Sequence, residues 1–349
     1  QLAEILQLSG LRWLALTGTA VTDEGVAAIA QLPHLEKLWL SQTQITDKSL
    51  AYLSGCQHLL HLSVEATATT DAGVREIAKM SKLKVLSLGS PTITADGLAP
   101  LSNLKSLEEL YLDRLPVGVR SVAAISQLRE LQVVSLRHTP VTDAGIVRLG
   151  RMPRLSRMLL DGTSISDDAL KSARWPQLIE LSARGTRLTD AGLDSLANCH
   201  RLQSLRLDGT KCTLAGLHRL LVEKQSRSWE SALAVAFKNK LDEQGRTISL
   251  DLTGFRIRDS DIRLLAELRE LQWLIMPDNE LTDAGAQAIV DARLDKLTLL
   301  NINRSTITDA GLRLLAKVKN LRTLHVAGTK LSTDAISAVE KESPTLRIY

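Results

Sequence analysis

A hydroxyl beside a carboxylate recurs along this chain. Residues 140–146 read PVTDAGI, and close variants stand at 20–26, 187–193, 280–286 and 306–312. Such a pair could do chemistry, with the hydroxyl as nucleophile and the carboxylate assisting it. A catalytic pair is needed only once, however, whereas a structural element that repeats needs its end residues in every copy. The repetition therefore favours a structural role for the Thr-Asp pair.

The Thr-Asp pairs stand just before short helical patterns. In TDEGVAAIAQL (22–32), Val26, Ile29 and Ala30 recur at the spacing of one helix face. The hydroxyl can accept a free amide of the first turn, and the helix dipole favours the Asp carboxylate at the first helical position. We expect helix caps at Thr22, Thr46, Thr70, Thr94, Thr142, Ser166, Thr189, Thr213, Thr282, Thr308 and Ser332.

No other pattern predicts catalysis, a cofactor or a metal site. The seven histidines form no His-Glu-x-x-His motif, and the chain has no Gly-x-Ser-x-Gly motif. Cys56, Cys199 and Cys212 are too few and too scattered for a disulfide framework or a zinc site. We expect them to be reduced, buried thiols, which favours a reducing compartment such as the cytoplasm without fixing it. The sequence predicts no enzyme.

The elements that carry the caps follow a fixed period. The pattern L-x-x-L-x-L begins every 24 residues, at Leu11, Leu35, Leu59, Leu83, Leu107, Leu131 and Leu155. It continues at Leu178, Leu202, Thr247, Leu271, Leu297 and Leu321. Each copy contains a short strand and a short helix, which bury their apolar faces only when copies stack. We expect one domain over 1–349, built of about thirteen repeats.

This pattern resembles the leucine-rich repeat family. It is most similar to the 24-residue Thr-Asp-Ala-Gly-Leu type of bacterial repeats and less so to the cysteine-containing repeats of F-box adaptors. The resemblance implies an α/β solenoid, or horseshoe, with a parallel sheet on the concave face and α-helices on the convex face. F-box repeats carry Cys or Asn after the strand, whereas here the position is mostly Thr. We expect these hydroxyls to form a ladder between repeats.

Three segments depart from the period. The step from Leu202 to Thr247 predicts a helical insertion at about 222–246, in which Trp229, Leu233, Phe237 and Leu241 recur every four residues after Ser228. This helix could pack on the convex side or dock a partner. The fifth copy, LPVGVRSV (115–122), lacks the Thr-Asp pair. Residues 1–10 predict the helix of a repeat without its strand, so we expect a processed chain or a fragment.

Charge and hydropathy exclude two kinds of partner. The 43 basic and 39 acidic residues give a net charge of +4, and they are mixed along the chain. No Lys/Arg run predicts specific nucleic-acid binding. No apolar run approaches the roughly 18–20 residues that a membrane span requires.

The strand pattern places alternate residues on the concave surface. Aromatic and Arg side chains are common interface anchors, and four of the few aromatic residues fall in these outward columns. Val133 and Ser135 are also expected to face outward. Some members could instead shield the sheet by packing on each other. The predicted binding residues are Trp13, Lys37, Trp39, His61, Glu109, Tyr111, Arg137, Arg157, Arg184, Arg206, Asp251 and Trp273.

These observations lead to a hypothesis of a non-enzymatic scaffold that binds a partner protein or peptide through the concave face. The alternative is a substrate-recruiting or sensing segment of a larger enzyme, such as a kinase or a ubiquitin ligase. Self-association through the ends or the convex helices is a third possibility.

Overall fold

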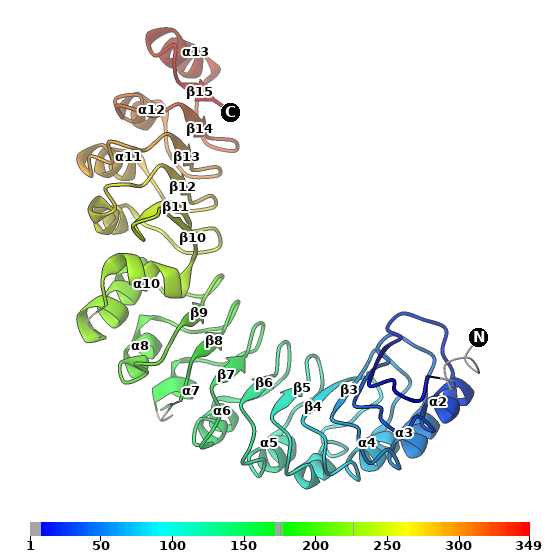
Figure 1. Cartoon of the computed structure of the whole chain (residues 1–349). Coiled ribbons are helices and arrows are strands. Elements are labelled where there is room, and N and C mark those ends of the chain that lie inside the picture. The colour runs from blue at the N-terminus through cyan, green and yellow to red at the C-terminus, as the bar shows by residue number, and fades with distance from the viewer. Residues whose placement is uncertain (1–7, 172–174, 176, 226) are drawn as a thin grey trace. The chain divides into compact units, whose positions relative to one another are not determined.

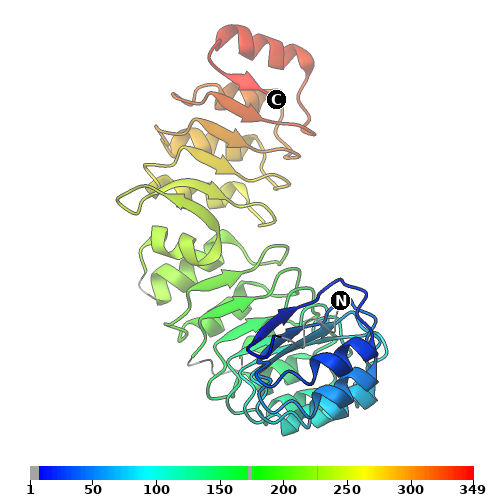
Figure 2. The ribbon, with the colours of Figure 1, turned by 45° about the vertical axis from the view of Figure 1, so that its right-hand side comes forward.

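The computed structural model describes residues 8–171, 175, 177–225 and 227–349. The chain divides into two compact units, Gln1–Ser182 (unit 1) and Ala183–Tyr349 (unit 2). In each unit, short strands lie side by side and the helices pack behind them (Figures 1 and 2). The helix predicted over 1–10 falls mostly on residues 1–7, which lie outside the described residues. The prediction that 1–349 form one domain stays a prediction.

Unit 1 repeats a strand and a helix in chain order. Its strands pair in parallel with a regular register, for example Trp13 with Lys37 and Lys37 with His61. The strands are β1 (Trp13–Ala15), β2 (Lys37–Trp39), β3 (His61–Glu65), β4 (Val85–Gly89), β5 (Glu109–Tyr111), β6 (Val133–Ser135), β7 (Arg157–Leu159) and β8 (Glu180–Ser182). The helices are α2 (Asp23–Ile29), α3 (Asp47–Leu53), α4 (Asp71–Ile77), the 3-10 helix η1 (Ala99–Asn103), α5 (Val119–Ile125), α6 (Asp143–Leu149) and α7 (Asp167–Lys171).

Unit 2 contains a six-stranded sheet in the order β10 to β15, in which β10 is antiparallel to β11 and the other pairs are parallel. Its strands are β9 (Ser204–Arg206), β10 (Lys238–Leu241), β11 (Thr247–Asp251), β12 (Trp273–Ile275), β13 (Leu299–Asn301), β14 (Thr323–His325) and β15 (Arg347–Ile348). Its helices are α8 (Asp190–Leu193), the 3-10 helix η2 (Asp194–Leu196), α9 (Leu214–His218), the π-helix η3 (Arg219–Lys224), α10 (Trp229–Ala236), the 3-10 helix η4 (Asp259–Glu267), α11 (Asp283–Asp291), α12 (Asp309–Leu315) and α13 (Thr333–Glu342).

The core lies between the strands and the helices. The consensus leucines of the strands, such as Leu38 and Leu62, are fully buried, and so are Leu50 and Val74 on the helices behind them. Because alternate strand residues face opposite sides, burying one column presents the other on the strand face. We use strand face for the surface formed by these outward side chains.

The insertion in unit 2 contains a helix and a strand. Helix α10 begins after Ser228, whose Oγ accepts a hydrogen bond from the Ser231 amide at 3.2 Å. The helix ends at Ala236, so the prediction that Phe237 and Leu241 lie on it was wrong. The chain instead continues as β10 because Lys238–Leu241 find backbone partners on β11. Phe237 packs edge-on against Phe255, with ring centroids 4.9 Å apart.

Most of the predicted helix caps are confirmed. The hydroxyl of Thr46, for example, accepts the Lys48 amide at 3.3 Å. Two of the caps were wrong. Thr22 donates to the Glu24 carboxylate and caps no amide. Thr94 accepts the Gly97 amide in a turn, and η1 begins only at Ala99.

The Asp of the motif has a role beyond its own helix. The Asp47 carboxylate accepts hydrogen bonds from the amide of Thr70 at 2.8 Å and from its hydroxyl at 2.6 Å, one repeat further on. We call this pair of bonds the inter-repeat latch. The same latch joins Asp23 to Thr46, Asp71 to Thr94, Asp143 to Ser166, Asp190 to Thr213, Asp259 to Thr282, Asp283 to Thr308 and Asp309 to Ser332.

The Gly of the motif makes room for this latch. A Cβ atom at Gly73 would lie 2.3 Å from Oδ1 of Asp47, closer than real side chains approach. In the second repeat Ser49 occupies the Gly position, and its hydroxyl donates to Oδ1 of Asp23 at 2.5 Å. Thr, Asp and Gly therefore serve contacts between neighbouring repeats as well as the cap.

The fifth repeat of unit 1 lacks the latch. Gly118 and Val119 stand where most other repeats have Thr or Ser and then Asp, so Val119 offers no acceptor to Thr142. A mainly apolar cavity of 200 Å³ opens beside them, lined in part by Val122 and Gly145. The sequence irregularity thus marks a local packing gap.

The Thr column after the strands bonds locally. The hydroxyls of Thr43 and Thr139 donate to the carbonyls of Leu40 and Leu136, three residues earlier, at 2.6 and 2.7 Å. The predicted ladder between repeats was wrong, because a carbonyl within the same repeat lies closer to each hydroxyl. Asn279 in the same column reaches the preceding repeat, where its Oδ1 accepts the Ile257 amide at 2.6 Å.

Removing a latch should destabilise the fold. In Asp47→Ala, the half-buried Thr70 amide and hydroxyl lose their acceptor, at a cost of about 1–3 kcal/mol in the free energy of unfolding. In the control Asp168→Ala, an exposed carboxylate paired with Lys171 is removed, at a cost below about 1 kcal/mol. Chemical denaturation measures both variants. Equal losses in the two would contradict the role of the latch.

The latch should also make stability sensitive to acid. Burial opposes ionisation of Asp23, but hydrogen bonds from Ser49 and Thr46 outweigh it and lower its pKa, and bonds from Ser332 lower the pKa of Asp309. A lowered folded-state pKa stabilises the fold above the ordinary carboxyl pKa of about 4, and this contribution is lost as pH falls through the lowered value. Denaturation at pH values between about 5 and about 2 should therefore show a smaller acid-dependent loss in Asp309→Asn than in the wild type. An identical acid-dependent loss in Asp309→Asn and in the wild type would contradict a role for the latch in acid sensitivity.

Candidate protein-binding face

The structure gathers most of the predicted binding residues into local groups. In unit 1, β1 to β3 carry the N-terminal cluster, defined as Trp13, Lys37, Trp39 and His61. Glu109, Tyr111 and Arg157 form a second group on β5 and β7, and Arg137 belongs to a row of alternating charges. In unit 2, Arg184, Arg206 and Asp251 line one cavity, and Trp273 stands apart from it.

The N-terminal cluster follows from strand register. Trp13, Lys37 and His61 lie directly opposite one another on successive strands. The Lys37 ammonium lies 4.4 Å from the ring centroid of Trp13, within cation–π range. Trp39 packs on His61 with ring centroids 4.8 Å apart. Trp13 nevertheless keeps 61% of its surface exposed, so the contact with Lys37 orients this ring without burying it.

The electrostatics of the cluster favour neutral His61. Burial of the imidazole lowers its pKa most, and the nearby Lys37 charge lowers it further, while Glu109 acts in the opposite sense. At neutral pH the cluster therefore presents aromatic surface with a single cation, Lys37.

The second group is held by hydrogen bonds. The Tyr111 hydroxyl donates to Oε2 of Glu109 at 2.7 Å. Burial of the phenol, together with Glu109, raises the pKa of Tyr111 to about 12. Arg157 donates through Nε to Glu180 at 2.8 Å, and this bond raises its pKa. Tyr111 and Arg157 are therefore each paired with a carboxylate of the strand face.

Arg137 lies between two carboxylates. Its guanidinium is 3.6 Å from Asp113 and 3.1 Å from Asp161. Val133 and Ser135 lie opposite Glu109 and Tyr111 in the outward columns, as expected, but both are buried. The Ser135 hydroxyl donates to Asp113 at 2.5 Å. Long neighbouring side chains cover the small residues of this column.

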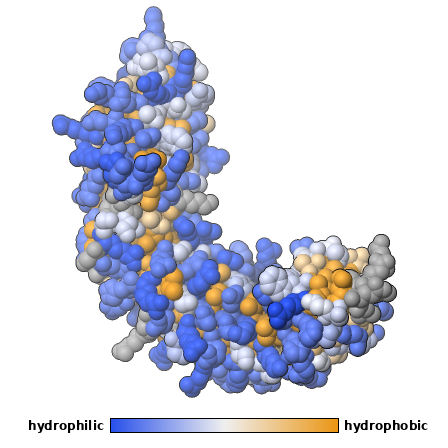
Figure 3. Space-filling model, in the orientation of Figure 1, coloured by the Kyte–Doolittle hydropathy of each residue, from blue (hydrophilic) through white to orange (hydrophobic). Residues whose placement is uncertain are grey.

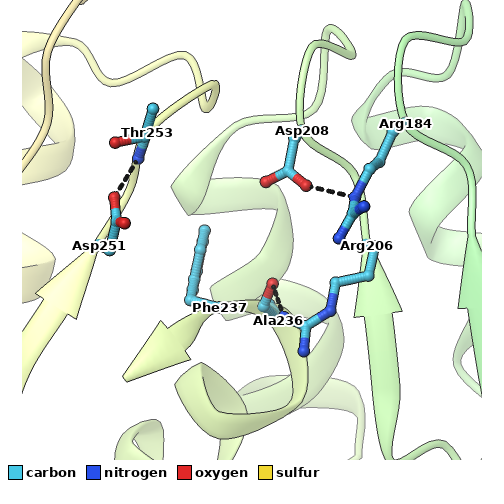
Figure 4. Close-up of a pocket in the computed structure, with 7 residues that line it drawn as sticks. All are labelled: Arg184, Arg206, Asp208, Ala236, Phe237, Asp251 and Thr253. Atoms are coloured by element: carbon cyan, nitrogen blue, oxygen red, sulfur yellow. Dashed lines mark hydrogen bonds and ion pairs between the residues drawn. The ribbon is translucent and has the colours of Figure 1, made fainter. Parts of the chain in front are cut away.

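The strand-face cavity lies in unit 2. It has a volume of 340 Å³ and is lined by Arg184, Arg206, Asp208, Ala236, Phe237, Asp251 and Thr253. Figure 4 shows the arginines and Asp208 on one side, Asp251 and Thr253 on the other, and Phe237 between them. The sequence predicted three lining residues as binding residues. It missed Ala236 and Phe237, because they reach the cavity only through the hairpin of β10 and β11.

Trp273 on β12 is 47% exposed and lies opposite Leu299 on β13. Elsewhere, the face of the molecule seen in Figure 3 is mainly hydrophilic, with hydrophobic side chains showing in small areas. Exposed tryptophans at Trp13 and Trp273 are therefore distinctive features of the described strand face.

Burial disfavours the thiolate form of two cysteines. Burial raises the pKa of Cys199 to about 11 and also raises that of Cys56, so both favour the thiol form. Cys199 and Cys212 are buried as expected, but Cys56 is only half-buried, since it lies in the turn after α3. Within the described residues, no three His, Cys, Asp or Glu side chains gather as a metal site, and no helix is long and apolar enough to cross a membrane.

Comparisons with known proteins agree with the repeat pattern. A family model described as a leucine-rich repeat matches residues 11–30. An internalin of Listeria monocytogenes has a similar structure, with a TM-score of 0.58 at 18% identity over 99% of this chain and 92% of the internalin. The chain has the leucine-rich repeat fold. Its α/β repeat fold is thereby confirmed, while the 24-residue Thr-Asp-Ala-Gly-Leu type stays a prediction.

Two further solved structures are similar. A protein of Leptospira interrogans gives a TM-score of 0.54 at 18% identity, covering 100% of this chain and 98% of that chain. The plant peptide hormone receptor RGFR1, solved in complex with RGF2, gives 0.50 at 16% identity, covering 99% of this chain and 56% of that chain. At these identities the likeness shows the fold alone. No curated protein matches the sequence.

The geometry of the N-terminal cluster predicts how His61 titrates. Removing the neighbouring cation in Lys37→Met should raise the His61 pKa towards its ordinary value of 6.5, while burial keeps it below that value. Lys48→Met, on helix α3, should leave it unchanged. Nuclear magnetic resonance of the imidazole protons across pH gives both values. An unchanged pKa in Lys37→Met would show that the two side chains do not interact.

Proposed function

We propose that this leucine-rich repeat protein is a recognition scaffold that binds a partner protein through its strand face. The observation that carries the proposal is the N-terminal cluster, above all Trp13, which is 61% exposed and has its ring beside Lys37. An exposed indole offers a large contact area, and a partner that covers it gains the hydrophobic free energy of that area.

The cluster has the physical character of a binding anchor. Ordered strands fix the positions of Trp13, Lys37 and His61, and ring contacts restrict Trp39. A partner therefore loses little free energy in ordering these side chains. Tryptophan is also among the residues that most often dominate interface energetics.

The charge of the cluster indicates what the partner presents. Lys37 has no carboxylate within ion-pair distance among the described residues. A carboxylate on the partner, placed beside an apolar group that covers Trp13, would complement it. The partner surface expected here is thus apolar with an acidic rim.

The comparisons support recognition as the general role. Proteins with this fold generally act as interaction scaffolds, and the similar plant receptor was solved with its peptide hormone. The predicted absence of enzymatic activity belongs to the same proposal.

Truncating the tryptophans should weaken partner capture. Trp13→Ala and Trp39→Ala together remove most of the aromatic contact area, so affinity should fall at least ~10-fold. Tyr52→Ala is a matched control, because Tyr52 is a large exposed aromatic residue on helix α3. The immobilised wild-type protein would first capture the partner from an extract of the native source. Titration of the wild type and of each variant with the purified partner would then give Kd values.

Circular dichroism melts must show that all variants fold like the wild type. If Trp13→Ala/Trp39→Ala binds as tightly as the wild type while Tyr52→Ala does not, recognition uses the helix side and the proposed face is wrong.

A further inference from the structure

The strand-face cavity occupies an interruption in the strand pairing of unit 2. The six-stranded sheet begins at β10, which turns back along β11, and it does not include β9. The Arg206 side chain on β9 donates through Nη1 to the carbonyl of Ala236, at the end of α10, at 3.2 Å. The insertion thus replaces regular pairing with a hollow between β9 and β11 (Figure 4).

The charges of this cavity are only partly satisfied. Arg184 donates to Asp208 at 2.7 Å, so these two charges offset each other. Asp251 accepts the Thr253 amide through Oδ1 at 2.9 Å, and its Oδ2 has no hydrogen-bond donor among the described residues. On Arg206, the Nε and Nη2 edge likewise has no acceptor within the described part of the chain.

Arg206 and Asp251 therefore present opposite charges into one hollow. They form no ion pair with each other in the described structure, where they stand on opposite sides of the cavity. An Arg edge with two N–H groups binds a carboxylate through two parallel hydrogen bonds. A single free carboxylate oxygen binds an ammonium or a guanidinium. A ligand with both groups would satisfy both walls.

We infer that the strand-face cavity binds a short peptide segment with an acidic and a basic side chain on the same side of an extended chain. The carboxylate bonds Nε and Nη2 of Arg206, and the cation bonds Oδ2 of Asp251. This inference rests on the proposed function only in taking the ligand to be a peptide. It names a second site, built entirely from residues of unit 2.

The size and lining of the cavity fit two side chains. Its 340 Å³ lies at the small end of the range for ligand sites, of roughly 300–1,000 Å³, and is too small for a folded domain. Phe237 lies between the charged walls, where the aliphatic stems of Glu and Lys side chains can pack. Residues two apart on an extended chain point to the same side, which sets the spacing of the two charges.

Synthetic peptides test this site directly. Acetyl-Gly-Glu-Gly-Lys-Gly-amide should bind the full chain at least ~10-fold more tightly than the matched peptides with Gln in place of Glu or of Lys. Heteronuclear resonance titrations give the affinities and place the shifts at β9 and β11. Equal affinities of the three peptides, or shifts confined to other strands, would overturn the inference.

Variants test which cavity residue binds which charge of the peptide. Arg206→Lys keeps the charge but removes the double N–H edge, so the Glu-containing peptides should lose at least ~5-fold in affinity. Asp251→Asn keeps the Thr253 bond and should abolish the preference for Lys over Gln. Arg304→Gln is the control, an exposed Arg paired with Asp278 outside the cavity. Preferences unchanged in Asp251→Asn would overturn the inference even if Arg206→Lys fails to fold.

The proposals for the strand-face cavity and for the N-terminal cluster can be tested separately. Trp13→Ala/Trp39→Ala should keep full peptide binding at the cavity, because its changes lie in unit 1. Loss of the peptide preference with partner capture intact would refute the cavity alone, and the reverse would refute the N-terminal cluster alone.

Discussion

The Asp carboxylate between successive helix starts is the interaction on which the regular structure depends. In each latch it accepts the amide and the hydroxyl of a Thr or Ser in the next repeat, and the third residue after that Thr or Ser is small: Gly, Ser or Ala. The latch joins neighbouring repeats in addition to the pairing of their strands, which keeps the same register between β5 and β6, where the latch is missing. Because the latch and the leucine core hold the fold, outward strand residues are free to vary for recognition.

The irregular places are where this constraint is relaxed. Val119 cannot accept a hydrogen bond, and an apolar cavity opens beside it. In unit 2, Leu214 stands at the Asp position, and the following segment holds the insertion and the strand-face cavity. These two departures from the repeat thus each have a cavity nearby.

The period of the sequence was sufficient to predict the repeat fold, most caps and the outward columns, since these depend on local patterns. It could not predict that Asp47 accepts hydrogen bonds from Thr70, because a repeated spacing does not show whether the donor lies in the same repeat or in the next one. The hairpin was missed because a four-residue spacing fits a helix, whereas the pairing of Lys238 with Asp251 is a long-range contact. Burial of Val133 and the shape of the strand-face cavity depend on such contacts too.

Native-state hydrogen exchange of the threonine amides tests the central claim most directly, because the chain contains its own control. The amides of Thr46, Thr70, Thr282 and Thr308 are bonded to the Asp of the preceding repeat, whereas Thr142 faces Val119. We expect slow exchange at the four latched amides and fast exchange at Thr142. Equal protection at Thr142 and the latched amides would contradict the account.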